Sequence, residues 1–500
     1  MKNKFYATAI TLVAALGGLL FGYDTAVISG TTGALDNFFV RPLMSDPIAA
    51  ASVIAEYRVI VSISFLFVSI LLSSFMLKLF GRTKGTMISV GLVLVGALLW
   101  YTQFWNQSTE INEAMASAIK GFVISSALVG CIIGGSLGGY VSTTLGRRLG
   151  LLLSAFLFTL SAIGSALPDY LNILQVETVS SLIFYRIVGG VGVGLASMLS
   201  PMYIAEISPA DQRGKLVTYQ QYAIIGGMVV VYFVNYFISL QGSETWLNEI
   251  GWRWMFASEI IPCIVFFTLL LFVPETPRYL VMVDQEQKAT ALLVKLVGEK
   301  RAKVEMSEIK GSLVEKHAPW LSFGGWVIVA GILISFFQQA VGINVVLYYA
   351  PEIFRTMGSS NDSSLMQTII VGVVNLTFIT LPFMLSDKYG RKPFMIIGAL
   401  GMAVSMVGLG CTFYFKSVGL LSLIFMLTYT ASFAISWGPV AWILLSEMFP
   451  NSIRGAMAIA VAAQWLSNLV VSWTFPMLND SVYLTANYNH AFAYWVYAVF

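Results

Sequence analysis

A carboxylate interrupts the first apolar segment of the chain. Asp24 lies in the stretch FGYDTAVISG, residues 21 to 30, near the end of a run from Ala7 to Ile28 that is otherwise free of charge. An unpaired carboxylate in apolar surroundings favours its protonated form, whereas a nearby cation favours the ionised form. An acid that alternates between these two states could therefore carry a proton through a conformational cycle.

Arg186, in SLIFYRIVGG, is the partner that we expect for this acid. We interpret it as the only other charge deep within an apolar segment of the first half of the chain. Charged side chains inside membrane-spanning segments are functional by default, often in proton or substrate pathways. The alternative is a static salt bridge that only holds two helices together.

Amides and aromatic residues gather in apolar segments of the second half. A neutral ligand that carries hydroxyl groups needs neutral groups that both donate and accept hydrogen bonds, together with a flat apolar surface. For any single amide, the alternative is a hydrogen bond that joins two helices. Several amides in one half favour a binding site for such a ligand. The candidates there are Gln338, Gln339, Asn344, Tyr348, Asn375, Gly438, Trp442, Gln464 and Trp465, and Gln221 joins them from the first half.

Gln338 and Asn344 cannot share one face of a straight helix. At about 100° per residue, their side chains would point about 120° apart. Broken helices are tolerated where they line a cavity, and Gly342 lies between the two residues. We therefore expect a break near Gly342 that turns both amides towards one site.

The elements that position these residues are membrane-spanning helices. Of 500 residues, 57% are hydrophobic and 11% are charged, and the mean hydropathy is +0.80, which excludes an ordinary soluble domain. Apolar runs of about 20 residues, long enough to cross a bilayer as helix, recur along the chain. They are too long for β-barrel strands, so the fold class is an all-α polytopic membrane protein. We count fourteen spans, and the last is cut off at Phe500 as if the chain were truncated.

Basic residues set the expected orientation and the domain boundaries. Clusters around Arg82, Arg147 and Arg391 fall in alternate loops, which the positive-inside rule places in the cytoplasm together with the N-terminus. The long Lys- and Glu-rich loop 279–318 is expected to be a cytoplasmic linker between an N-terminal bundle, 1–278, and a C-terminal bundle, 319–500. Region 57–117 holds two spans and is predicted to be a transmembrane hairpin inserted in the first bundle.

The two halves repeat each other. LGRRLG at 145–150 resembles YGRKPF at 389–394 with an offset of 244, and the segment from Glu206 to Arg213 resembles that from Glu447 to Arg454 with an offset of 241. Each copy lies at the cytoplasmic end of a span, which indicates a duplicated bundle. Two halves in one orientation suit a carrier that rocks one bundle against the other around a central site.

These motifs, with PETPR at 274–278 and QQAVGIN at 338–344, resemble the sugar porter family of the major facilitator superfamily. GGLLFGYDTAVISG and VGINVVLYYAPEIF further resemble the bacterial D-xylose–proton symporters. The resemblance implies two six-helix bundles with a sugar site between them, here with two extra transmembrane helices inserted after the first span. It also implies that the binding candidates given above hold or border the sugar, because each matches a position that the family uses in this way. It also implies cytoplasmic gating charges, which match Arg147, Arg148, Glu206, Arg213, Glu275, Arg278, Asp387, Arg391, Glu447 and Arg454; Thr143 departs from the family by replacing an acidic residue.

By this resemblance, the expected function is proton-coupled symport of a monosaccharide, with D-xylose favoured, across the bacterial inner membrane. The alternatives are a facilitative hexose carrier and a sugar-sensing receptor of the same fold. Two histidines and the lack of an acid–nucleophile cluster at depth in the sequence argue against an enzyme. We expect no cofactor, no metal and no nucleic-acid partner, and a monomer in the lipid bilayer.

Overall fold

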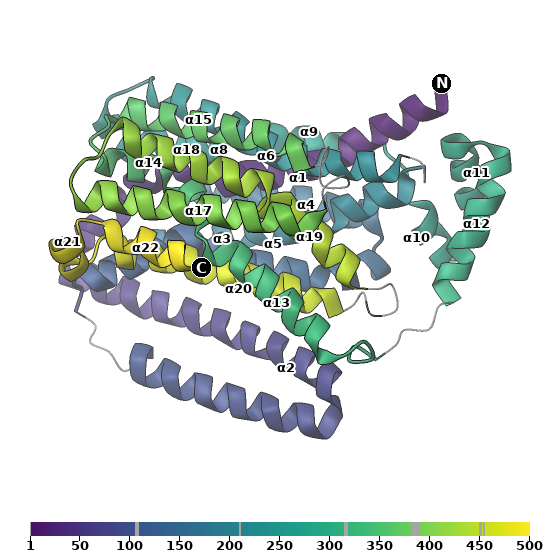
Figure 1. Cartoon of the computed structure of the whole chain (residues 1–500), viewed down its shortest axis with the longest axis horizontal. Helices are drawn as coiled ribbons and strands as arrows, with labels where there is room; N and C mark the ends of the chain where they lie inside the picture. Colours follow the sequence, from purple (N-terminus) through teal and green to yellow (C-terminus); the bar gives the residue numbers. More distant parts are fainter. Residues whose placement is uncertain are drawn as a thin grey trace.

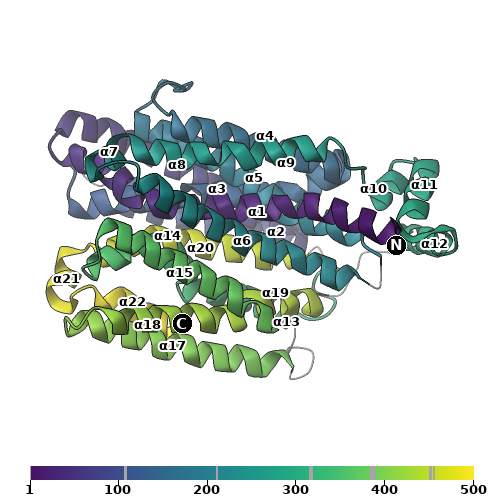
Figure 2. The same cartoon turned by 90° about the horizontal axis from the view of Figure 1, so that it is seen from above.

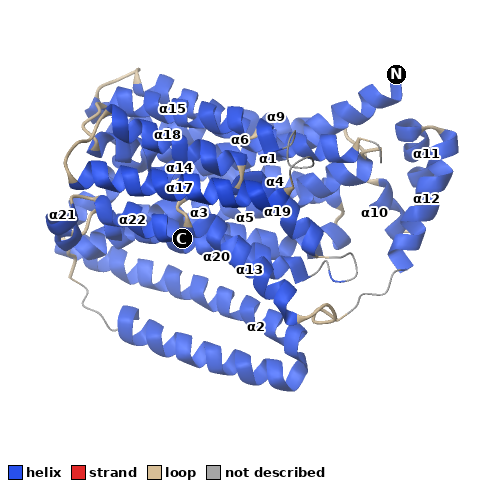
Figure 3. Ribbon diagram, in the orientation of Figure 1, coloured by secondary structure: helices blue, strands red, loops and turns tan. Residues whose placement is uncertain are grey.

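The computed structural model describes residues 2–105, 110–209, 212–314, 319–382, 390–449, 453 and 456–500. Every regular element in these ranges is a helix (Figure 3). Twelve of the helical segments are long and apolar enough to cross a membrane. The predicted all-α polytopic fold is therefore confirmed.

The N-terminal half is built from helices that precede residue 271. Short π-helical and 3-10 turns extend or join the longer helices at one end of this half. The elements are α1 (Lys2–Leu35), η1 (Asp36–Val40), η2 (Arg41–Met44), α2 (Pro47–Trp100), η3 (Tyr101–Trp105), α3 (Glu113–Thr144), α4 (Arg147–Ala166), α5 (Thr178–Ile207), α6 (Arg213–Ser239), α7 (Glu244–Trp246), η4 (Leu247–Gly251), α8 (Trp252–Ser258) and α9 (Ile260–Leu270).

Three short helices follow, and the C-terminal half comes after them. The three are α10 (Pro277–Met282), α11 (Glu286–Val297) and α12 (Glu299–Val314), which occupy the predicted linker. The C-terminal half contains α13 (Gly325–Ala340), α14 (Ile343–Thr356), α15 (Asn361–Phe378), α17 (Arg391–Tyr414), α18 (Leu420–Ile435), α19 (Trp437–Met448), α20 (Met457–Asn479), α21 (Val482–Tyr488) and α22 (Ala491–Val499).

The two halves lie side by side as layers. Figure 2 shows the purple-to-teal helices of the N-terminal half above the green and yellow helices of the C-terminal half. The layers meet where α3 packs on α20, α6 on α15 and α1 on α14. Helices α10 to α12 project from one end of the molecule, and α21 lies at the opposite end (Figure 1). We call these the inner end and the outer end, following the predicted orientation.

Close backbone contact holds the centre of the N-terminal half together. Gly130 and Gly134 of α3 face α5, where an added Cβ would lie 2.0 Å from Ile187 O and 2.2 Å from Val191 O respectively. Gly190 of α5 faces α3 in the same way, 1.8 Å from Ala127 O. Small residues let membrane helices approach this closely. The glycine-rich run at 189–194 therefore serves helix packing on α5, the helix that carries Arg186.

The predicted hairpin forms at the edge of the molecule. Helix α2 bends sharply at Gly81, whose φ of 75° suits glycine, and its two arms run beneath the other helices in Figure 1. It begins at Pro47 rather than at residue 57, because the Asp46 side chain caps the backbone of Ile48 and Ala49. The single segment from Pro47 to Leu98 thus accounts for two of the fourteen predicted spans. The last predicted span corresponds to α22, nine residues long and outside the twelve.

Candidate functional site

Asp24 and Arg186 form a buried ion pair in the middle of the N-terminal half. Arg186 Nη1 of α5 donates to Asp24 Oδ1 of α1 at 2.8 Å, and Nη2 donates to the backbone oxygen of Asp24 at 3.3 Å. The two side chains are 0% and 2% exposed. Asp24 Oδ2 and Arg186 Nε have no hydrogen-bond partner among the described residues. The predicted pairing is confirmed, and it leaves one carboxylate oxygen unsatisfied.

Glu259 is a third charge in this region that the sequence interpretation missed. It lies between α8 and α9 and is 1% exposed, and both of its carboxylate oxygens lack a hydrogen-bond partner within the described structure. The neighbouring Ser258 is joined to Tyr23 of α1, with 2.8 Å between the hydroxyl oxygens. Glu259 interacts electrostatically with both Asp24 and Arg186, so it belongs to the same buried cluster of charges. Arg186 is therefore not the only other deep charge in this half. The sequence signal for Glu259 was an acidic residue within the otherwise apolar run from Trp254 to Val273.

The predicted helix break is present at Gly342. Helix α13 ends at Ala340 and α14 begins at Ile343, and Gly342 between them is left-handed with a φ of 87°. Asn344 Nδ2 donates to Gln339 Oε1 across the break. The break is confirmed, and the amide that lies against Asn344 across it is Gln339. That Gln338 and Asn344 face one site stays a prediction.

Gln338 is anchored to a second broken helix. Its Nε2 donates to the backbone oxygens of Trp437 at 2.8 Å and Gly438 at 3.2 Å, where α18 gives way to α19. Its Oε1 is buried without a partner in the described structure. The Nε2 atom of Gln338 thus joins α13 to the start of α19, and its Oε1 atom can accept a hydrogen bond from another donor.

The remaining sugar candidates lie on helices around these breaks. Trp465 of α20 reaches across to the N-terminal half, with its ring centroid 5.7 Å from that of Phe21 on α1. Gln464 is buried, and its Oε1 has no partner among the described residues. Tyr348 of α14 and Asn375 of α15 are also buried, whereas Gln221 of α6 and Trp442 of α19 are half-buried.

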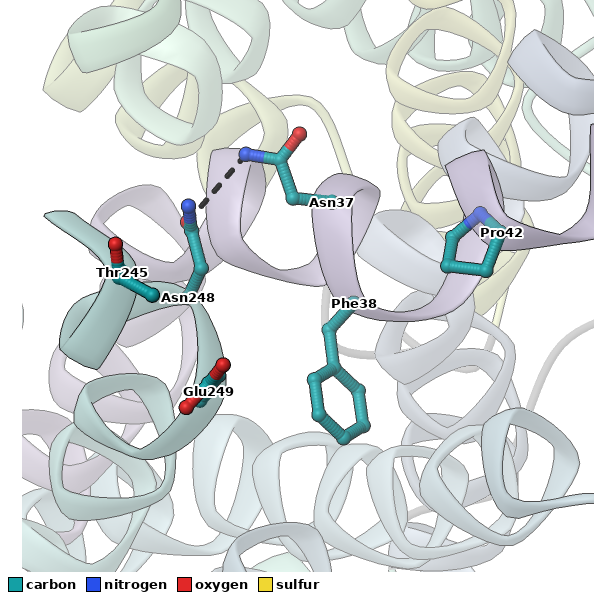
Figure 4. Close-up of a pocket in the computed structure, with 6 residues that line it drawn as sticks. All are labelled: Asn37, Phe38, Pro42, Thr245, Asn248 and Glu249. Atoms are coloured by element: carbon teal, nitrogen blue, oxygen red, sulfur yellow. Dashed lines mark hydrogen bonds between the residues drawn. The ribbon is translucent and has the colours of Figure 1, made fainter.

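The pocket in Figure 4 lies away from these residues. It occupies about 460 Å³ at the outer end of the N-terminal half, between η1 and the α7–η4 segment. Asn37 Nδ2 donates to Asn248 Oδ1 at 3.4 Å across its rim. Its lining residues are Asn37, Phe38, Pro42, Thr245, Asn248 and Glu249, none of which is a sugar candidate.

A charge network closes the inner end of the N-terminal half. Arg147 of α4 donates through Nη2 to Glu206 Oε1 at 2.8 Å, and Glu206 Oε2 accepts from Thr276 Oγ1 at 2.6 Å. Glu275 accepts from the backbone nitrogens of Arg147 and Arg148, at 3.2 and 3.0 Å. Burial raises the pKa of Glu275 above its usual value, although these backbone donors counteract part of the effect.

The same pair recurs in the C-terminal half. Arg391 Nη2 of α17 lies 2.9 Å from Glu447 Oε1 of α19. Arg148 forms no ion pair with another residue in the described part of the chain; its guanidinium donates to the backbone oxygens of Leu270 and Leu271. Arg278 makes no salt bridge with another described residue. Asp387 and Arg454 lie outside the described residues, as does the side chain of Arg213.

Comparison with known proteins agrees with this architecture. The family model described as "Sugar (and other) transporter" matches residues 10–110 and 100–500. The chain belongs to this sugar transporter family. Its members are carriers, so the protein is a multi-pass membrane transporter of the major facilitator fold and not an enzyme.

Similar proteins include both coupled and uncoupled sugar carriers. The chain is 47% identical to the D-xylose-proton symporter of Escherichia coli, across 99% of this chain and 90% of that protein. It is 37% identical to the glucose facilitated diffusion protein of Zymomonas mobilis, across 99% and 92%. The partially occluded inward-open structure of the xylose transporter XylE from E. coli superimposes with a TM-score of 0.76 at 45% identity, across 99% of this chain and 96% of that one.

Proposed function

We propose that this protein is a proton-coupled monosaccharide symporter, with D-xylose as its preferred substrate. The observation that carries the proposal is the buried Asp24 and Arg186 pair, whose second carboxylate oxygen has no partner. A purely structural salt bridge would be expected to satisfy both oxygens, because an unpaired buried acceptor is costly. The similarity to a D-xylose-proton symporter supports the choice of sugar.

The proton is held by the cluster of Asp24, Glu259 and Arg186. Two ionised carboxylates beside one guanidinium would leave a net negative charge in an apolar region, which is strongly unfavourable. One bound proton neutralises the cluster. Movement of α1 relative to α5 during transport would change the distance between Asp24 and Arg186 and thereby the affinity for this proton.

The sugar binds between the halves, beside the breaks in the C-terminal half. The unpartnered oxygens of Gln338 and Gln464 accept hydrogen bonds from sugar hydroxyls. Gln339 and Asn344, now bonded to each other, exchange that bond for hydroxyl groups. Trp465 supplies the flat apolar surface, and Gln221, Tyr348, Asn375, Gly438 and Trp442 complete the site.

The transport cycle is alternating access. The two layers rock about the central contacts of α1 with α14 and α3 with α20. The inner-end charges, including Arg213, Arg278, Asp387 and Arg454, act as the cytoplasmic gate. We propose the bacterial inner membrane as the location, a cytoplasmic N-terminus, and a monomer as the functional unit.

The decisive experiment is sugar-induced alkalinisation in proteoliposomes. D-xylose, D-glucose and L-arabinose are compared for the unmodified protein and for Asp24→Asn. We expect D-xylose to give the largest signal, and Asp24→Asn to abolish alkalinisation while sugar exchange between the two sides continues.

The matched control is Asp169→Asn, which removes an acid in the α4–α5 connection that pairs with Arg253 and is 38% exposed. This variant should retain coupled uptake. Accumulation of sugar by Asp24→Asn against its gradient would overturn the proposal. If sugar does not accelerate proton flux through the unmodified protein, the protein is instead a facilitative carrier.

A further inference from the structure

Lys120 is a buried cation at the outer end that none of the steps above uses. It lies near the start of α3, and its side chain is only 8% exposed. A buried ammonium group requires anionic partners to offset its loss of hydration. The carboxylates that pair with Lys120 therefore identify the helices that it holds together at the outer end.

Two of the partners belong to the other half of the protein. The Nζ atom of Lys120 donates to Glu352 Oε1 of α14, and it lies 3.1 Å from Asp480 Oδ2, directly after α20. A third acid, Asp36 of η1, lies 3.8 Å away and belongs to the same half as Lys120. One cation thus bridges two carboxylates across the boundary between the halves.

The backbone is tightly packed at the same place. A Cβ added to Gly121 would lie 2.2 Å from the backbone oxygen of Trp473 on α20. The indole Nε1 of Trp473 in turn donates to the backbone oxygen of Ala118 at 3.0 Å. Helices α3 and α20 therefore cannot separate at the outer end without exposing Lys120 and breaking its bonds to the C-terminal half.

We propose that Lys120, Glu352 and Asp480 form an outer latch that holds the extracellular side closed. The proposal rests on the proposed alternating-access function and identifies a gating residue for it. When the halves separate at the outer end, Lys120 leaves Glu352 and Asp480, and Asp36 remains beside it as a carboxylate partner. This exchange of partners lets the latch open without leaving a buried cation alone.

Removal of the cation should open the outer end. In Lys120→Met, Glu352 and Asp480 face each other without a positive charge between them, and their repulsion favours separation. Glu352 Oε2 already lacks a partner among the described residues. The closed arrangement should therefore lose stability relative to the open one.

The test measures the distance across the outer end directly. Nitroxide labels are attached to Tyr170→Cys, in the α4–α5 connection, and to Tyr483→Cys, in α21; both tyrosines are exposed, at 81% and 72%. Cys131, Cys263 and Cys411 are replaced by serine, because they are the three native cysteines. Pulsed electron–electron double resonance gives the distribution of distances between the two labels. It is recorded in proteoliposomes without sugar or a pH gradient.

We expect Lys120→Met to raise the ratio of long to short distances about fivefold or more. Lys120→Arg should keep the distribution of the unmodified protein, because it keeps the charge. Arg41→Met is the matched control: Arg41 also binds Asp36, at 3.2 Å, but it has no contact with the other half among its described ion pairs.

The double variant Glu352→Gln/Asp480→Asn removes the acceptors of the C-terminal half and leaves Lys120 beside Asp36. It should shift the distribution in the same direction as Lys120→Met, and it provides the readout if that variant does not fold. An unchanged distribution in the variants that fold would overturn the latch. The distance measurement uses neither sugar nor a proton gradient, so an unchanged distribution would overturn the latch without contradicting the symport proposal. Conversely, a failure of coupled uptake would contradict the symport proposal without changing the measured distances.

Discussion

Arg147 and Glu206 form a nearly enclosed ion pair at the inner end, with 2.8 Å between Nη2 and Oε1. The corresponding pair in the C-terminal half, Arg391 and Glu447, has almost the same separation, 2.9 Å. Their surroundings differ. The first pair is 5% and 13% exposed, whereas the second is 27% and 48% exposed. The duplicated motif therefore produces the same contact in both halves, and we expect the more buried pair to contribute more to the free energy of unfolding.

The two pairs should respond differently to loss of their acids. Glu206→Gln leaves the buried Arg147 without its counter-ion, which is expected to lower the free energy of unfolding by about 3 kcal/mol. Glu447→Gln breaks a partly exposed pair, for which about 0–1 kcal/mol is expected. Thermal unfolding of the detergent-solubilised variants measures the difference. Equal losses would show that burial does not distinguish the two pairs.

The second prediction concerns Glu259 and the pH dependence of transport. Glu259→Gln removes a negative charge beside Asp24 and Arg186, so the remaining pair is neutral without a bound proton. Proton uptake then becomes less favourable, and the pH of half-maximal sugar uptake should move at least about one unit lower. The measurement is the initial uptake rate between pH 5 and 8.

Glu249→Gln is the control for that shift, because Glu249 is an exposed acid on the same stretch of chain, in η4. Its pH profile should match that of the unmodified protein. A profile for Glu259→Gln that coincides with both would mean that Glu259 does not share the proton of the cluster.

The sequence predicts the fold and the pairings that depend on strong local signals. Apolar runs of helical length identify the spans, and Gly342 together with the spacing of Gln338 and Asn344 identifies the broken helix. The duplicated motifs predict charge pairs but not their burial, which depends on how α4, α5 and α10 pack.

Glu259 and Lys120 were overlooked for a related reason. Each is a single charge near one end of an apolar run, where a charge usually indicates that the span ends and that the side chain is hydrated. Their enclosure results from tertiary contacts: Tyr23 with Ser258 beside Glu259, and the second half of the chain around Lys120. Position along a span predicts depth in the membrane, but it does not predict which neighbours surround a side chain.

The third prediction tests the role of Gln338 in the sugar site. Gln338→Leu removes both the bond to the backbone of α19 and the free Oε1 acceptor. A lost hydrogen bond to a buried partner is worth about 1–3 kcal/mol, so the sugar affinity should fall about tenfold or more. Isothermal titration with D-xylose measures the change.

Gln367→Leu provides the matched control for that titration. Gln367 lies on α15 and accepts from Ser359 near the outer end, away from the helix breaks. Its removal should leave the sugar affinity unchanged. A similar affinity in Gln338→Leu would restrict Gln338 to holding α13 against α19 and would exclude it from the site.

The last prediction addresses the break itself. Gly342→Ala places a side chain where φ is 87° and where its Cβ would meet the ring of Tyr497 at 2.8 Å. The left-handed backbone alone costs about 1–2 kcal/mol for a residue with a Cβ, and the ring must also move. Because Gln339 and Asn344 flank this position, we expect lower sugar affinity together with lower thermal stability. Gly358→Ala separates the two effects, since Gly358 has a φ of 92° but no atom within 4 Å of its added Cβ. It should lose stability and keep its affinity for sugar; a matching loss of affinity there would show that general destabilisation, and not the geometry of the break, weakens binding.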